Sequence, residues 1–151
     1  MPRRRSRGLR GERGEAQVEF ALSIMTVLVT IFFGWELLMA MYTASVLADA
    51  AKEGVRYAIV HGSNSTLCSG PNASKPCASD PGAAEVVNTV KNYAQASLHD
   101  ITAINVAVTY PDGSNDAPNR VAVTVTYNFV PYINLPFTPT LTTKAAGRIV
   151  N

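Results

Sequence analysis

One apolar run constrains the fold of this chain more than any other feature. Between Glu19 and Asp49 the only charged residue is Glu36. An α-helix rises by about 1.5 Å per residue, so about 20 apolar residues cross the roughly 30 Å hydrocarbon core of a lipid bilayer. The run is too long and too apolar for a core helix in a chain of 151 residues. It predicts a transmembrane helix over about residues 20–42.

Positive charge is concentrated on the N-terminal side of this run. The first 14 residues contain six arginines and one acid, whereas the rest of the chain contains seven Lys and Arg against ten Asp and Glu. Because basic residues flank membrane spans on the cytoplasmic side, the pattern predicts a cytoplasmic N-terminus and an exported C-terminal part. Nucleic-acid binding is the alternative explanation of an arginine tail. We expect no nucleic-acid partner, because a basic tail beside a span is more often a topology signal.

Small and hydroxylated residues form a stripe on one face of the predicted span. They fall within a sector of about 80° around a helix. Such a stripe lets two helices approach closely in lipid, with weak hydrogen bonds between them. The alternative is that the hydroxyl groups bond to carbonyls of their own helix. We favour a helix-packing face that comprises Glu19, Ser23, Thr26, Thr30 and Gly34.

The helical pattern continues beyond the predicted span. Nothing in the sequence stops a helix between Glu15 and Gly62, and the last part of this stretch is amphipathic. Gly54 lies in the amphipathic part and costs about 1 kcal/mol relative to alanine, so we expect a close neighbour that needs the space. The apolar stripe of this part consists of Ala44, Leu47, Ala48, Ala51, Val55, Ala58 and Ile59.

The two cysteines, Cys68 and Cys77, both lie in the part that is predicted to be exported. Export permits a disulfide, and closing a ring of about ten residues would contribute roughly 2.7 kcal/mol. Zinc binding is the weaker alternative, because two cysteines alone lack the other ligands that zinc needs. Neither His61 nor His99 lies in a metal-binding spacing. We therefore predict a disulfide and no metal site.

The exported part is predicted to form a small domain of mixed structure. Asp80-Pro81 opens a second helix that reaches about His99. Alternating apolar residues then predict two strands with a long connecting loop, followed by a third strand. These strands cover about 104–110, 121–129 and 141–150. The predicted fold class is α+β, in which a long N-terminal helix packs on a small antiparallel β-sheet with one further helix.

No segment of the sequence carries a catalytic motif. The chain lacks the nucleophile elbow G-x-S-x-G, a phosphate-binding glycine loop and the zinc-protease pattern H-E-x-x-H. The neighbours His99 and Asp100 could act as a base and its orienting carboxylate, but a helix end explains them better. We expect a structural protein that is not an enzyme, with no cofactor and no small-molecule substrate.

The start of the long helix carries the one motif with specific chemistry. Glu19 lies at the predicted membrane boundary, where an unpaired charge is costly. Cleavage after Gly14 would release a cationic amine at Glu15, about one helical turn from Glu19 or beside the Glu19 of a neighbouring subunit. A glycine before the cut suits a protease that needs an extended, unhindered backbone.

This arrangement resembles the type IV prepilin leader, in which a short basic segment and glycine precede the cut and glutamate is the fifth mature residue. The pair Glu19-Phe20 resembles the form found in the tight-adherence (Flp) pilus branch. Residues 49–57 resemble the alanine-rich, Gly-x-Arg stretch of TadE-like pilus assembly proteins. The resemblance covers residues 8–60 well and the remainder in outline. Glu36 departs from it, because a pilin usually has an unbroken apolar run.

The resemblance implies cleavage between Gly14 and Glu15 by a prepilin peptidase on the cytoplasmic side. The product would be a minor pilin or pseudopilin of a bacterial tight-adherence pilus or secretion machine, held by a single span in the cytoplasmic (inner) membrane. Its partners would be other pilin subunits and pilus assembly proteins. Glu19 and Phe20 would set the subunit register.

These expectations divide the chain into a basic cytoplasmic leader (1–14), a long pilin-like helical spine (15–62) and an extracytoplasmic domain (63–151) with a disulfide loop (68–77). The alternative function is an unprocessed single-pass anchor that carries an extracytoplasmic binding domain. A secretory signal cut after Ala50 fits less well, because the apolar region of such signals spans about 7–15 residues.

Overall fold

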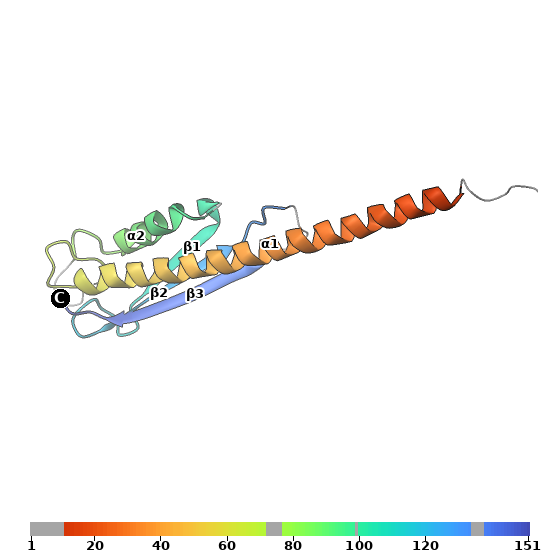
Figure 1. Ribbon diagram of the computed structural model, residues 1–151. Coiled ribbons are helices and arrows are strands. Elements are labelled where there is room, and N and C mark those ends of the chain that lie inside the picture. Colours follow the sequence, from red (N-terminus) through yellow and green to blue (C-terminus); the bar gives the residue numbers. More distant parts are fainter. Residues whose placement is uncertain (1–10, 72–76, 99, 134–137) are drawn as a thin grey trace, which may run out of the picture. The chain divides into compact units, whose positions relative to one another are not determined.

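The computed structural model describes residues 11–71, 77–98, 100–133 and 138–151 (Figure 1). Its elements are, in order, α1 (Gly11–Val60), α2 (Ala84–Gln95), the short 3-10 helix η1 (Ile101–Ala103), β1 (Ile104–Thr109), β2 (Arg120–Asn128) and β3 (Thr140–Arg148). They confirm the predicted α+β class, with a long N-terminal helix, one further α-helix and an antiparallel sheet. The chain divides into two compact units, Met1–Leu38 and Met39–Asn151, and the boundary between them falls within α1.

The N-terminal end of α1 lies at Gly11, before the expected start at Glu15. The helix therefore reaches into the predicted leader (1–14), of which residues 1–10 lie outside the described part of the chain. Extending a helix by one residue needs no new nucleus, so the helix continues through Gly11 and Gly14 although glycine costs about 1 kcal/mol relative to alanine. The long helix can therefore continue into the basic segment.

The C-terminal end of α1 lies at Val60, close to the predicted stop at Gly62. The backbone N–H of His61 still donates to the carbonyl of Tyr57, at 3.1 Å. Gly62 is buried against Ile149, and an added Cβ would collide with that side chain. The segment after β3 can therefore approach the end of α1 because this position has no side chain.

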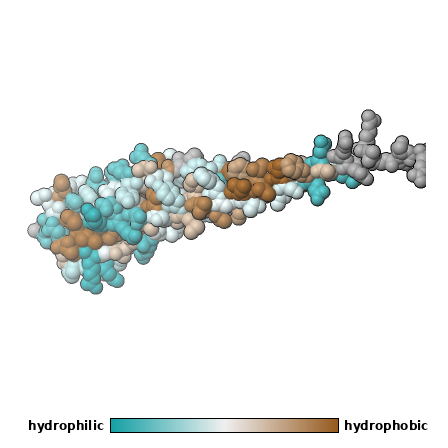
Figure 2. Space-filling model, viewed as in Figure 1, coloured by the Kyte–Doolittle hydropathy of each residue, from teal (hydrophilic) through white to brown (hydrophobic). Residues whose placement is uncertain are grey.

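The described part of α1 in the first unit exposes its apolar side chains, which form the brown band in Figure 2. Leu22, Val27 and Ile31 are 60, 57 and 59 % exposed. Among the described helices, α1 alone is long and apolar enough to cross a membrane, and 6 % of its most apolar 18-residue window is buried. The core helix of a soluble protein is mostly buried, so α1 has the length, composition and exposure of a candidate membrane span.

The three strands of the second unit form an antiparallel sheet in the order β1-β2-β3. The predicted alternation is confirmed on the central strand, where Val121, Val123 and Val125 are fully buried. The register pairs Val125 with Val106 of β1 and with Thr143 of β3. All strand ends fall within two residues of the predicted ones.

Both helices of the second unit pack on the buried face of this sheet (Figure 1). Gly54 lies at the closest approach, because an added Cβ would collide with Val90 of α2 and lie 3.6 Å from Val123 of β2. This confirms the close neighbour that the sequence predicted at Gly54. At Gly147 of β3 an added Cβ would lie 2.9 Å from Val55 of α1. Two glycines thus bring the backbone of α1 close to its neighbours.

The second helix is shorter than predicted. It begins at Ala84 and not at Asp80, and it ends at Gln95 before His99, which lies outside the described residues. The turn that precedes it ends at Ala83, which adopts a left-handed φ of 56°. Asp80 lies upstream of this turn and accepts a hydrogen bond from the backbone N–H of Ala84 at 2.7 Å. Asp80 therefore caps the N-terminus of α2 although it is not part of that helix.

We predict that Gly54→Ala destabilises the second unit although alanine is the better helix former. The added methyl group would collide with the fully buried Val90, and overpacking of this kind costs about 1–3 kcal/mol. Thermal unfolding of the full-length protein in detergent micelles, followed by near-UV circular dichroism, measures the change. Gly82→Ala is the control, because Gly82 is exposed and an added Cβ meets nothing within 4 Å. A Gly54→Ala variant as stable as the wild type would contradict the close packing.

Candidate functional site

Three of the residues predicted to guide processing and subunit register, Gly14, Glu15 and Glu19, line a shallow surface groove on α1. Phe20 does not line it. The described lining is Gly14, Glu15, Val18, Glu19, Leu22, Ser23 and Thr26. Each of these residues is exposed, and all come from the same helix. The groove is therefore an open helix surface and not an enclosed ligand pocket.

Helical geometry brings Glu15 and Glu19 to neighbouring positions on this face. Four residues of an α-helix correspond to a rise of about 6 Å and to nearly the same direction around the axis. Phe20, which follows Glu19, is 67 % exposed. The peptide bond between Gly14 and Glu15 lies within α1, so a peptidase that needs an extended backbone must first unwind the helix there. The cleavage itself stays a prediction.

The threonines of the predicted packing face bond within their own helix. The hydroxyl of Thr26 donates to the carbonyl of Leu22, and that of Thr30 donates to the carbonyl of Thr26, each at 2.9 Å. This is the alternative considered for the stripe, and it satisfies both hydroxyl groups inside the apolar run. Gly34 continues the same face, with no atom within 4 Å of an added Cβ. The role of the stripe in packing against other helices stays a prediction.

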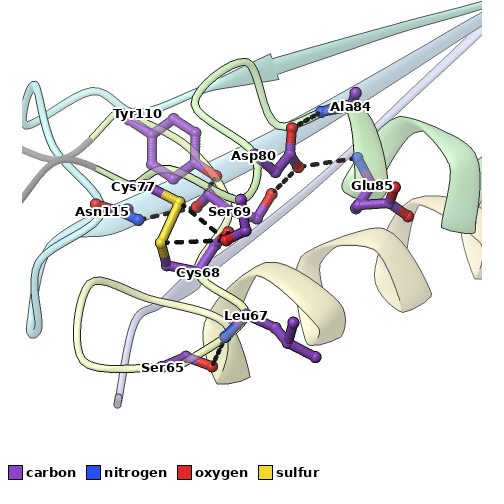
Figure 3. Close-up of a disulfide and its surroundings, with 11 residues drawn as sticks. Ser65, Leu67, Cys68, Ser69, Cys77, Asp80, Ala84, Glu85, Tyr110 and Asn115 are labelled. Atoms are coloured by element: carbon purple, nitrogen blue, oxygen red, sulfur yellow. Dashed lines mark hydrogen bonds between the residues drawn. A yellow bond between two sulfur atoms is a disulfide. The ribbon is translucent and has the colours of Figure 1, made fainter.

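A disulfide joins Cys68 and Cys77 in the second unit, which confirms the predicted pairing (Figure 3). Their Cα atoms are 5.7 Å apart, within the usual range for disulfides. Ser79 follows the loop, and its hydroxyl donates to the carbonyl of Cys68 at 2.9 Å. A covalent bond and a hydrogen bond therefore hold the two ends of this loop together.

Asp80 accepts three hydrogen bonds beside the disulfide (Figure 3). The hydroxyl of Ser69 donates to its carboxylate at 2.5 Å, and the backbone N–H groups of Ala84 and Glu85 donate at 2.7 and 2.9 Å. Burial raises the pKa of Asp80, but the hydrogen bonds from Ser69, Glu85 and Ala84 outweigh it and hold the pKa below the usual 3.8. Asp80 is thus a carboxylate at neutral pH that ties the disulfide loop to the start of α2.

The carbonyl of Ser69 joins the disulfide loop to the segment after β1. It accepts hydrogen bonds from the side-chain amide of Asn115 at 3.0 Å and from the hydroxyl of Tyr110 at 3.2 Å. Burial, with a contribution from the charge of Asp80, raises the pKa of Tyr110 to about 12, so its hydroxyl remains a donor. Gly70 has a φ of 103°, and the ring of Tyr110 occupies the space that a Cβ there would need.

The disulfide was predictable from the sequence, whereas the polar network around it was not. Ser69 and Asp80 are 11 residues apart, and Ser69 and Asn115 are 46 apart, so neither contact leaves a local pattern. The one available signal was an aspartate just before the second helix, which is typical of a cap. The network has a structural role. Among the described residues, no group of three or more His, Cys, Asp or Glu could hold a metal ion.

Residues 14–56 match a family model described as TadE-like protein. The match confirms the resemblance to the TadE-like pilus assembly family, and it suggests a protein associated with a tight-adherence pilus and with a membrane. No curated protein matches the chain, and no solved structure matches it. The matched segment lies within α1, so the similarity concerns the helix and not the sheet.

We predict that the stability of the second unit depends on the ionised form of Asp80. Asp80→Asn would place an amide donor either against both the Ser69 hydroxyl and the Glu85 N–H or against the Ala84 N–H, at a cost of about 1–3 kcal/mol at neutral pH. Because the pKa of Asp80 is lower in the folded state than in the unfolded state, its contribution is complete above 3.8 and is lost as the pH falls below that value. The difference in melting temperature between the wild type and the variant should therefore shrink in acid.

The control for this measurement is Asp49→Asn, since Asp49 pairs with Lys52 on the solvent-exposed surface. It should leave the melting temperature nearly unchanged, because exposed ion pairs contribute little. A stability difference between Asp80→Asn and the wild type that stays constant from neutral pH to well below 3.8 would contradict the role of the carboxylate.

Proposed function

We propose that this protein is a minor pilin or pseudopilin of a bacterial tight-adherence (Flp, type IVb-like) pilus or secretion machine. A prepilin peptidase would cut it between Gly14 and Glu15. The observation that carries the proposal is the position at which the TadE-like match begins, which is Gly14. The arginine-rich segment before it lies outside the match, in agreement with a leader that the mature protein loses.

Removal of the leader would change the charge at the start of α1. Six arginines and one acid leave with the first 14 residues, and a single new amine appears at Glu15. In surroundings of low dielectric constant this amine and the Glu19 carboxylate attract each other strongly, because water does not screen them. A subunit displaced along the helix axis would leave Glu19 without its partner in an apolar environment, which is costly. The pair would therefore set the register between subunits.

The packing face would then contact helices of other pilin subunits. Its members are Ser23, Thr26, Thr30 and Gly34, next to Glu19. Thr26 and Thr30 have satisfied their hydroxyl groups within α1, so close packing leaves no buried donor unpaired there. In lipid, helix association depends on close van der Waals contact, which small residues permit. Phe20 would add exposed apolar surface beside the register residue.

The proposed location is the bacterial cytoplasmic membrane, with one span. The arginine-rich end would stay in the cytoplasm. The second unit would lie outside, where oxidising conditions preserve the disulfide between Cys68 and Cys77. In this role the protein is a structural subunit and not an enzyme, and its partners are the prepilin peptidase, other pilins and the assembly machinery.

We predict that Glu19→Ala leaves membrane insertion intact and lowers the amount of the protein in sheared pili by more than about tenfold, because an unpaired amine remains in each subunit. Membrane fractionation and immunoblotting of sheared filaments measure the two quantities. Val18→Ala is the matched control, since Val18 lines the same groove and carries no charge. Normal piliation with Glu19→Ala would contradict the register role and would favour an anchored domain that never enters a filament.

A further inference from the structure

The outer edge of β3 is an unpaired strand edge. β3 runs over nine residues and pairs with β2 on one side, and no other described strand pairs with it (Figure 1). Such an edge presents unpaired backbone N–H and C=O groups that can template another strand. Its inner-face residues point toward α1, because Gly147 lies against Val55 and Ile59 of that helix.

A cavity of about 170 Å³ lies between this edge and α1. Its described lining consists of Ala44 and Leu47 of α1 and of Thr140, Leu141, Thr142 and Thr143 of β3. Successive strand residues point to opposite faces, so four consecutive lining residues mean that the cavity follows the edge of the strand. A cavity of about 150 Å³ holds a benzene-sized group, so this one has room for one branched aliphatic side chain. We name this cavity and the unpaired edge of β3 (Thr140–Arg148) beside it the edge groove.

Positive charge lies next to the edge groove. Lys144 and Arg148 are exposed on the outer face of β3, and neither forms an ion pair with a described residue. Their cross-strand partners on β2 are Thr124 and Arg120. Arg120 pairs with Asp112 at 2.7 Å, and the charge of Arg148 also helps to lower the pKa of Asp112, so one carboxylate offsets part of the positive charge at that end of β3. A strand that pairs with β3 would place two of its side chains opposite these cations, and opposite charges there stabilise pairing.

A second copy of this chain does not supply the matching charges. None of the three strands contains Asp or Glu. Pairing of β3 with a strand of another copy would bring the cations against neutral or basic residues. The strands of a second copy therefore lack the acids that would complement Lys144 and Arg148, which favours a strand from a different protein.

We propose that the edge groove binds an extended segment of another exported protein, which adds to β3 as an antiparallel strand. Acidic residues of that segment face Lys144 and Arg148, and an aliphatic residue enters the cavity between Leu47 of α1 and β3. Main-chain hydrogen bonds supply affinity in this mode of recognition, and the side-chain positions supply specificity. The inference does not depend on cleavage after Gly14, so the two can fail separately.

The test uses the full-length protein in detergent micelles and a fluorescent nine-residue peptide. The sequence Thr-Glu-Thr-Thr-Val-Glu-Leu-Thr-Val, paired antiparallel to β3, places its two glutamates opposite Arg148 and Lys144 and its leucine opposite Thr143 beside the cavity. We expect saturable binding by fluorescence anisotropy. The same peptide with lysine in place of both glutamates should bind about tenfold more weakly, because like charges then oppose each other.

Two protein variants test the cavity and the charge independently. Ala44→Phe fills the cavity and should weaken binding of the acidic peptide about tenfold, since one aliphatic side chain loses its burial. Ser45→Phe is its matched control, because Ser45 is the exposed neighbour on α1 and does not line the cavity. Lys144→Glu should weaken the acidic peptide and improve binding of the lysine peptide. Near-UV circular dichroism verifies that each variant keeps its fold.

Four results would overturn the proposal. The first is that neither peptide binds. The second is that both peptides bind equally, and the third is that the Ala44→Phe and Ser45→Phe variants bind the acidic peptide equally. The fourth is that the full-length protein is a dimer that Ala44→Phe converts to a monomer, because the occupant of the edge groove would then be a second copy.

Discussion

The unbroken backbone hydrogen bonding of α1 is the constraint on which the rest of the structure depends. A segment that crosses a lipid core has to stay helical, because no water is there to satisfy its peptide groups, and α1 has the length and composition of such a segment. Further along the sequence the same helix forms the core of the second unit, where Leu47, Ala50 and Ala51 are at most 1 % exposed. One helix therefore carries an exposed apolar surface and a packed face at different positions, and Gly54 lets the packed face approach its neighbours.

A disulfide and a set of buried hydrogen bonds reinforce the hydrophobic core of the second unit. The disulfide closes the loop between Cys68 and Cys77, and Asp80 connects that loop to the first turn of α2. Asn115 connects it to the segment that follows β1. These contacts fasten the irregular segments of the second unit to α2 and to one another.

Features with a local pattern were predictable from the sequence. The apolar run predicted the long helix, and the alternation of apolar residues predicted the three strands. The two cysteines in the part predicted to be exported indicated the disulfide. The start of α2 was predicted wrongly at Asp80, because a carboxylate can cap a helix across a turn without belonging to it. The hydrogen bond from Asn115 to Ser69 and the cavity between α1 and β3 join residues that are distant in sequence, so no local pattern predicts them. The proximity of Glu15 and Glu19 was predictable from their spacing, because residues four apart lie on the same face of an α-helix.

The mature N-terminus is the measurement that tests the pilin account most directly. Intact mass and terminal sequencing of the protein from cells with and without the prepilin peptidase would establish it. The account predicts a chain that starts at Glu15 when the peptidase is present and that keeps its arginine-rich leader when the peptidase is absent. An intact leader in both strains would contradict the account and leave a membrane anchor with an exported domain. A start at Ala51 would contradict it as well, because the protein would then be secreted without its span.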